Sequence, residues 1–264
     1  MVYGALVVCA VSLAAVGGLE VVRRLVPSEA RQKHNDVAGF IYAALGVIYA
    51  VLLALVVIAA WEGYERARVT VEDEANALAE IFWMAHWMPQ PQGREVQEVA
   101  RSYAQEVVDK EWPLMEQGRT PLMEDVQETP TGWVLIDDLR TKLNAFEPDT
   151  KAEQDLHAEG LDEVQRLADA RRMRLVAASE SMPPILWVVL IFGGVVTVGF
   201  TYLFGLENTW AHRLMVASLA AVIALVLFTI GNLEYPFSGS THVSPGAFEL
   251  ILNRFETSKL SDLR

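Results

Sequence analysis

The sequence predicts an all-α integral membrane protein with four transmembrane helices and an α-helical, water-facing domain inserted between the second and third. The first observation is that four long stretches contain no Asp, Glu, Lys or Arg. They are residues 2–19, 37–61, 181–206 and 214–233. A helix needs about 20 residues to cross a hydrocarbon core about 30 Å thick, and each stretch is close to that length. Four crossings are therefore expected.

The second observation is that the excess charge lies between the second and third of these stretches. Residues 62–182 contain 26 acidic and 13 basic side chains, so this segment accounts for the whole formal net charge of −13. Its negative sign repels nucleic acid, which is not an expected partner, and attracts cations. The expected divisions are the first two transmembrane helices in 1–61, an acidic helical domain in 62–182, a transmembrane hairpin in 183–233 and a tail in 234–264.

The first stretch is expected to remain as a helix and not to be cleaved as a signal peptide. No basic residue precedes it, it has no clear small-residue cleavage site, and Glu20, Arg23 and Arg24 follow it. The two arginines are candidate topology anchors that bind anionic lipid head groups, so membrane lipid is an expected partner. The single cysteine, Cys9, excludes a disulfide within the chain.

The orientation prediction uses the rule that Lys and Arg near transmembrane helices stay in the cytoplasm. The four basic residues after the first helix place the acidic domain outside the cytoplasm; they are Arg23, Arg24, Arg31 and Lys33. Five arginines flanking the second and third helices on the domain side favour the reverse; they are Arg66, Arg68, Arg171, Arg172 and Arg174. We favour the extracytoplasmic side, in a multi-pass protein of the inner cell membrane.

The second stretch is expected to continue as one long helix beyond the membrane. It begins near Asn35 and Asp36, residue types that suit a helix N-cap. No later proline interrupts the chain before Pro89. The helix should therefore extend to about Trp87.

Helical periodicity continues through the acidic domain. Apolar residues recur at helical spacing within 92–113, 132–146 and 152–181, and prolines separate these segments. Pro113 is expected to end the first helix, and the acidic domain should be a helical bundle. The tail contains a further amphipathic helix, which either lies on the membrane surface or packs on this bundle. Its apolar residues are Phe248, Ile251, Leu252 and Phe255.

The expected crossings lack charged residues, which excludes the usual proton relays and coupling-ion sites of transporters. A pore is still compatible with them, because small, hydroxyl and apolar side chains line channels whose mouths carry charged rings. The candidate pore residues are Tyr42, Gly46, Tyr49, Gly193, Gly194, Thr197 and Thr201. The glycines among them are equally suited to close helix packing.

Three carboxylates are expected where helices leave the membrane. Glu62 and Glu65 follow the second stretch, and Glu234 follows the fourth. In an oligomer they would form rings that concentrate cations. The alternatives are a solvated helix end, with Glu62 paired to Arg66, and a capping role for Glu234 at a neighbouring helix.

Glu72, Asp73 and Glu74 offer hard oxygen ligands for Ca²⁺ or another cation. Consecutive residues of a helix point about 100° apart, however, so such a run seldom encloses an ion. The five histidines are scattered without the spacing of a zinc site. No hydrolase, metalloprotease or phosphate-binding motif occurs, so the sequence predicts no enzyme and no other cofactor.

Five short stretches, in one order along the chain, point to a known family. They are VRRLVP at 22–27, HNDVAGF at 34–40, EANAL at 74–78, PPILW at 183–187 and EYPFSG at 234–239. The chain resembles bacterial membrane proteins labelled bestrophin-like, a family catalogued as a domain of unknown function. The resemblance implies a relation to bestrophins, which are oligomeric anion channels with four membrane helices per subunit and a mostly helical water-facing part. The chain departs from bestrophins in lacking an acidic calcium clasp near its end, and Glu234 replaces an aspartate that many relatives carry.

These features together predict a subunit of a homo-oligomeric ion channel with an acidic vestibule. Its expected partners are membrane lipid, further copies of itself and inorganic ions. The alternative is a non-conducting membrane sensor or scaffold, whose acidic helical domain binds a partner protein or a divalent cation.

Overall fold

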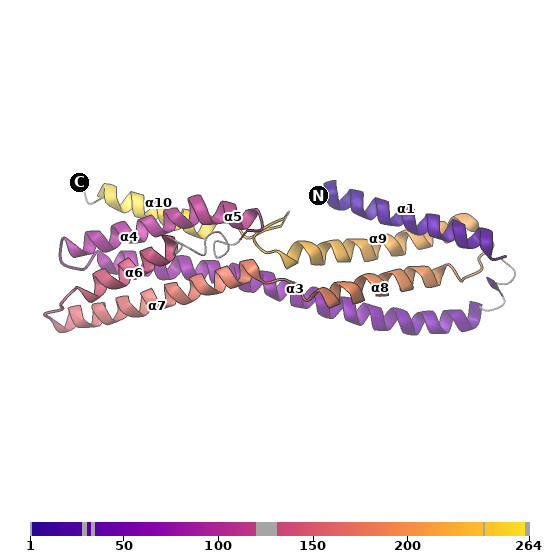
Figure 1. Cartoon of the computed structure of the whole chain (residues 1–264), viewed down its shortest axis with the longest axis horizontal. Helices are drawn as coiled ribbons and strands as arrows, with labels where there is room; N and C mark the ends of the chain where they lie inside the picture. Colours follow the sequence, from indigo (N-terminus) through magenta and orange to yellow (C-terminus); the bar gives the residue numbers. More distant parts are fainter. Residues whose placement is uncertain (1, 28–30, 33–34, 120–130, 240, 262–264) are drawn as a thin grey trace. The chain divides into compact units, whose positions relative to one another are not determined.

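A computed structural model of the chain describes residues 2–27, 31–32, 35–119, 131–239 and 241–261 (Figure 1). Within these residues the regular elements are all helices, as predicted, and no strand occurs. The chain divides into two compact units. The apolar unit comprises Met1–Glu62 and Ser181–Glu234, and the charged unit comprises Gly63–Glu180 and Tyr235–Arg264.

The prediction of four candidate membrane-spanning helices is confirmed in the described residues. They are α1 (Val2–Leu25), α3 (Asn35–Ala85), α8 (Pro184–Thr201) and α9 (Thr209–Glu234), each long and apolar enough to cross a membrane. Helix α8 begins at a proline, which suits the first turn of a helix because its missing N–H would have no partner there. Helix α3 is a single helix of 51 residues, so the predicted long continuation is also confirmed.

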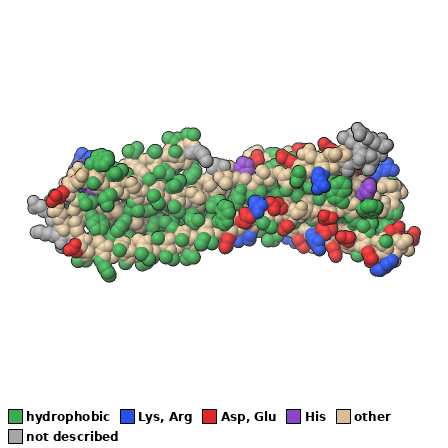
Figure 2. All heavy atoms as spheres, turned by 180° about the vertical axis from the view of Figure 1, so that it is seen from behind, with side chains coloured by type: hydrophobic (Ala, Val, Ile, Leu, Met, Phe, Trp, Pro, Cys, Tyr) green, Lys and Arg blue, Asp and Glu red, His purple; other side chains and the backbone are tan. Residues whose placement is uncertain are grey.

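The apolar unit is held together mainly by α1 lying along α9, with α8 against both. Leu19 and Ala15 of α1 and Val216 and Ala220 of α9 form a small buried cluster. Most other large apolar side chains point outward, and Figure 2 shows them covering the visible face of this unit. Phe40, for example, is 81% exposed. Apolar surface on this scale would be costly in water, so a lipid environment or neighbouring subunits must cover it.

The connection between α1 and α3 is tied to the end of α8. Arg31 donates hydrogen bonds to the carbonyls of Tyr202 (3.2 Å) and Phe204 (3.4 Å). Asn35, which was expected to cap its own helix, exchanges two hydrogen bonds of 3.0 Å with the backbone of Gly205. These contacts satisfy backbone groups at the α8 C-terminus, which its own helix leaves unpaired.

The charged unit is a helical bundle, in agreement with the prediction. Its described elements besides the second half of α3 are α4 (Gln92–Glu106), η1 (Val107–Glu111), α5 (Trp112–Glu116), α6 (Thr131–Asn144), α7 (Lys151–Ser179) and α10 (Gly246–Ser261). Helix α7 begins with a complete capping box, in which Thr150 and Glu153 satisfy each other's backbone amides. One apolar core runs through the bundle.

The expected end of a helix at Pro113 is wrong, because α4, η1 and α5 follow one another without a break to Glu116. The segment η1 is a π-helix, whose wider turns make i→i+5 hydrogen bonds. It lies just before Pro113, whose ring and missing N–H disfavour an ordinary helical turn there. The irregular turn accommodates the proline and places Glu111 in the interior.

Helix α10 packs on the charged unit, which is one of the two alternatives left open for the tail. Phe248, Ile251 and Phe255 are buried in the same core as the other helices. Phe255 stacks on Phe82 of α3 with ring centroids 3.8 Å apart, and its carbonyl accepts a hydrogen bond from Arg101. These contacts fix the tail helix to α3 and α4.

Candidate functional site

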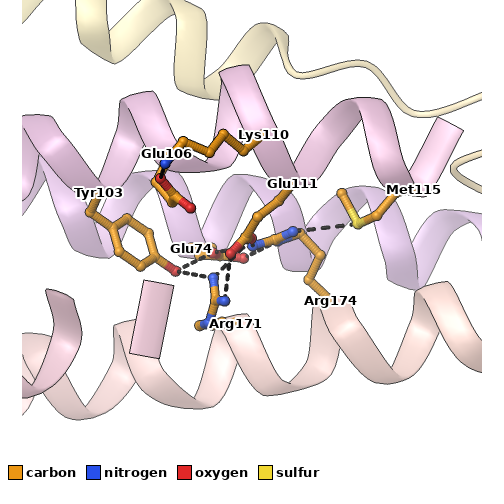
Figure 3. Close-up of polar contacts among 8 residues, drawn as sticks. All are labelled: Glu74, Tyr103, Glu106, Lys110, Glu111, Met115, Arg171 and Arg174. Atoms are coloured by element: carbon orange, nitrogen blue, oxygen red, sulfur yellow. Dashed lines mark hydrogen bonds and ion pairs between the residues drawn. The ribbon is translucent and has the colours of Figure 1, made fainter. Parts of the chain in front are cut away.

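The most distinctive polar feature of the described chain is a cluster of charges inside the charged unit. Its members, the buried cluster below, are Glu74 of α3, Tyr103 of α4, Glu111 of η1, and Arg171 and Arg174 of α7 (Figure 3). All five are buried, and Glu74, Arg171 and Arg174 are 0% exposed. Figure 3 shows these side chains, from α3, α4, η1 and α7, converging on one another.

The two arginines and two glutamates of the buried cluster compensate each other. Arg174 donates to Glu74 through Nε (2.6 Å) and Nη2 (3.0 Å), and also to Glu111 (2.8 Å). Arg171 donates to both oxygens of Glu111, at 2.9 and 2.6 Å. The Tyr103 hydroxyl donates to Glu74. Buried charges are tolerated when they are paired and hydrogen-bonded in this way, and the cluster sets two arginines against two glutamates.

The pKa shifts indicate which protonation states occur. Burial alone would raise the pKa of Glu111, but Arg174 and Arg171 outweigh burial and hold it below its ordinary value. Burial would likewise lower the pKa of Arg174, but Glu74 and Glu111 raise it well above the ordinary value. Burial and the neighbouring Glu74 raise the pKa of Tyr103 well above its usual range. These shifts favour the charged forms of Glu111 and of both arginines and the protonated form of Tyr103, which is the arrangement that the hydrogen bonds require.

The environment of Arg171 requires a glycine on α6. A Cβ atom added at Gly132 would lie 2.4 Å from the Arg171 guanidinium. Trp133, the next residue, places its ring 5.2 Å from the same guanidinium, within range of a cation–π interaction. Helix α6 therefore covers the buried cluster closely, and a larger side chain at residue 132 would displace the Arg171 guanidinium from its partners.

We expect acid to destabilise the charged unit partly through Glu111. Its folded-state pKa lies below the ordinary value of 4.5, so the unfolded chain binds the proton first. The stabilisation is fully present above that value and is lost as pH falls through the folded pKa. Urea unfolding in detergent, followed above and below pH 4.5, measures this loss. Glu111→Gln should be less stable at neutral pH but should lose less stability on acidification; an equal acid loss in both proteins would contradict the assignment.

The candidate metal residues do not converge. Glu72 and Asp73 are exposed, and Glu72 pairs with Arg68, whereas Glu74 lies in the core bound to Arg174. The rotation of about 100° per helical residue separates them in this way. Among the residues that the structure describes, no group of three or more His, Cys, Asp or Glu is arranged to hold a metal ion.

Sequence reasoning missed the buried cluster. It treated Arg171 and Arg174 only as charges relevant to topology, Glu74 as a metal candidate, and did not single out Glu111 or Tyr103. A signal was present, because each charge falls on the buried stripe of its own helix. The stripes contain Val71, Glu74 and Leu78 in α3; Tyr103, Val107 and Glu111 in α4 and η1; and Leu167, Arg171, Arg174 and Leu175 in α7.

Three pore candidates of the apolar unit meet at the contact between α3 and α8. The Tyr49 hydroxyl donates to the carbonyl of Leu190 at 2.9 Å. The Tyr49 ring lies over Gly193 and Gly194, where an added Cβ would come within 2.6 Å and 3.0 Å of it. In the single chain these residues therefore have a packing role, with the glycines allowing close approach of α8 to the tyrosine.

The remaining pore candidates occupy varied surroundings. Tyr42 stacks against Phe200 with ring centroids 5.9 Å apart, and a Cβ added at Gly46 would meet nothing within 4 Å. Thr201 donates to the carbonyl of Val198. The buried hydroxyl of Thr197 has no hydrogen-bond partner within the described part of the chain. The structure does not gather these four residues into one site.

The mouth candidates also differ from one another. Glu234 accepts hydrogen bonds from the backbone N–H of Met182 and from Trp187 Nε1, both at 2.9 Å, so it anchors the start of α8. Glu65 accepts from Arg68 at 3.1 Å. Glu62 is exposed on α3. Of the candidate lipid anchors, Arg23 pairs with Glu20 at 3.5 Å and Arg24 is exposed.

A groove of about 530 Å³ lies between α3 and α7 in the charged unit. Its lining includes Asp73, Glu80, Glu163 and Asp169, with Arg166 as a basic member. Burial and the neighbouring Glu80 raise the pKa of Glu163, although Arg166 opposes this shift. The groove is therefore acidic and open.

Comparisons with known proteins agree with this architecture. A family model described as Bestrophin-like domain matches residues 9–248. Three crystal structures of a bacterial bestrophin homologue from Klebsiella pneumoniae align with TM-scores of 0.70, 0.69 and 0.68, each at 13% sequence identity. The alignments cover 94–96% of this chain and 95–99% of the homologue. At this identity the likeness shows a shared fold. A comparison with curated proteins gave no match.

Proposed function

Because the chain belongs to the Bestrophin-like domain family, we propose that it is a subunit of a homo-oligomeric ion channel and not an enzyme. The family resemblance implies oligomeric channels, and the shared fold with a bacterial bestrophin homologue supports the same class of protein. The part of the charged unit between the second and third transmembrane helices, Gly63–Glu180, is proposed to face water, with the tail helix α10 packed on it. The protein would be multi-pass in the inner membrane, with this domain on the extracytoplasmic side.

The observation that carries the proposal is an uncovered apolar face on the membrane half of α3. Its exposed residues are Phe40, Val47, Ile48, Val51, Leu55 and Ile58. The opposite face is buried at Tyr49, Val56 and Ala60, so α3 presents one side to its own chain and leaves the other free. In a ring of subunits, this free side would surround an axial path, and apolar constrictions are a known means of gating.

Charges outside the membrane would control access to such a path. The chain carries a net charge of −13, all of it contributed by residues 62–182. An acidic vestibule lined by repeated copies of this segment would raise the local cation concentration. We propose Glu62 and Glu65 as mouth residues, whereas Glu234 would shape the mouth indirectly by holding α8.

Reconstituted protein tests the proposal directly. We expect purified protein in liposomes to conduct ions, and Glu62→Lys to shift the permeability ratio from cations toward anions. Asp155→Lys, the same charge change near the start of α7 and not at a proposed mouth position, is the control and should shift the ratio much less. Absence of flux at every voltage, pH and calcium concentration would reject the channel.

The acidic groove between α3 and α7 supports a second candidate, a non-conducting sensor or scaffold that binds a divalent cation or a basic partner. Calorimetric titration with Ca²⁺ tests this candidate, with Glu163→Gln as the variant expected to weaken binding. Saturable binding that Glu163→Gln weakens, together with no flux in liposomes, would favour the scaffold. A ring of subunits with an axial cavity would favour the channel.

A further inference from the structure

The apolar unit contains a groove of about 610 Å³ between α1, α8 and α9. Among its lining residues only Trp187 and Tyr202 carry a polar side-chain atom, and small residues such as Ala14, Gly199 and Ala224 leave the space open. These helices are candidate membrane spans, so in the proposed membrane arrangement the groove would face the hydrocarbon interior. We propose that it binds one acyl chain of an anionic phospholipid.

The length and lining of the groove suit an acyl chain. Trp187 and Tyr202 lie fifteen residues apart in the chain, which corresponds to about 22 Å of helix. All the other lining residues are apolar or glycine, so a hydrocarbon chain would bury its surface favourably against them.

The two ends of the groove have neighbours of opposite charge, so an anionic lipid would bind with its head group at one particular end. At the Trp187 end, the indole is bound to the carboxylate of Glu234. At the Tyr202 end, the hydroxyl lies against Gly18 of α1, where an added Cβ would approach it to 2.9 Å. Glu20 lies two residues further along α1, and the arginines Arg23, Arg24 and Arg213 lie near it and are called the basic group below.

This basic group is complementary to a phosphate. Glu20 accepts from Arg23 (3.5 Å) and from Arg213 (2.9 Å), so one carboxylate is shared by two arginines. Arg24 adds a third, exposed positive charge on the next turn of α1. Three arginines against one glutamate leave an excess of positive charge at this end of α1 and α9, which would stabilise an anionic head group. Trp187 and Tyr202 at opposite ends are also the side-chain types that occupy membrane interfaces.

A groove-filling substitution provides the test. A Cβ added at Gly199 would meet nothing within 4 Å, and Gly199 lines the groove, so Gly199→Leu places a larger side chain at the groove wall. Gly17 of α1 provides the matched control substitution, Gly17→Leu. A Cβ added there also meets nothing within 4 Å, but Gly17 does not line the groove. Delipidated protein in detergent is titrated with phosphatidylglycerol or phosphatidylcholine, and bound lipid is counted by native mass spectrometry.

We expect the unaltered chain and Gly17→Leu to retain one phosphatidylglycerol per chain in preference to phosphatidylcholine. Gly199→Leu should bind roughly tenfold more weakly, the effect of withdrawing about two methylene groups from the groove. Arg24→Gln should weaken phosphatidylglycerol and leave phosphatidylcholine unchanged. Phosphatidylglycerol with brominated acyl chains should quench a fraction of the tryptophan fluorescence, and Trp187→Phe should abolish that fraction.

Several outcomes would overturn the assignment. Equal lipid retention by Gly199→Leu and the unaltered chain would show that the groove holds no acyl chain. Equal losses in Gly199→Leu and Gly17→Leu would show that retention does not depend on this groove. A changed oligomer size in Gly199→Leu with unchanged lipid retention would assign the groove to a second copy of the chain. Ion flux is not part of the test, so the lipid site and the proposed channel can fail separately.

Discussion

Arg174→Met should destabilise the charged unit by about 3–5 kcal/mol, the cost typical of removing one partner from a buried ion pair. The substitution leaves Glu74 in the core with only the Tyr103 hydroxyl as a partner, and Glu111 loses one of its two arginines. A buried carboxylate without a counter-charge is far more costly than an exposed one. Urea unfolding in detergent, followed by tryptophan fluorescence, reports on the change because Trp112 lies beside Arg174 at 6.0 Å.

A double variant distinguishes the cost of an unpaired buried Glu74 from the cost of losing the whole Glu74–Arg174 ion pair. We expect Glu74→Leu combined with Arg174→Met to be more stable than Arg174→Met alone, since apolar replacements of a whole buried pair are often tolerated. The surface pair of Lys151 with Asp155 is the matched control, and Asp155→Asn should change stability by less than about 1 kcal/mol. If Arg174→Met cost no more than Asp155→Asn, the buried cluster would not stabilise the charged unit.

Phe82→Ala should cost a similar amount, about 3–5 kcal/mol, because it removes a large buried ring and leaves a cavity. Phe82 is 2% exposed, stacks on Phe255 of α10 and meets Trp83 edge-on at 5.3 Å. The loss should be greatest where α10 joins the bundle. Hydrogen exchange measured by mass spectrometry should therefore show faster exchange in α10 than in α6.

The control for this prediction lies on α10 itself. Leu250 is 63% exposed, so Leu250→Ala should change stability by no more than about 0.5 kcal/mol and leave α10 exchange unchanged. Unaltered α10 exchange in Phe82→Ala would mean that the tail helix is not held by this ring stack. The other buried contacts of α10, at Phe248 and Ile251, would then account for its position.

The sequence by itself determined the helical class and the four candidate membrane spans. Hydrophobic length and the absence of charge are properties of contiguous residues, so they can be counted without knowing what packs on what. The long α3 helix was predictable for the same reason, because only the absence of proline before Pro89 was needed. The five stretches that resemble the bestrophin-like family were also local, and the family match confirms them.

Only the tertiary structure decided which charged side chains are buried and which residues they pair with. Glu74 and Arg174 are one hundred residues apart, and their pairing depends on α7 lying against α3 in one register. Pro113 was misjudged because a π-helix, which local propensity does not indicate, carries the helix past it. Tyr49, Gly193 and Gly194 likewise acquire a packing role from the contact of two distant helices. Local pattern identifies what each helix is, whereas the partner of a side chain is a property of the three-dimensional arrangement.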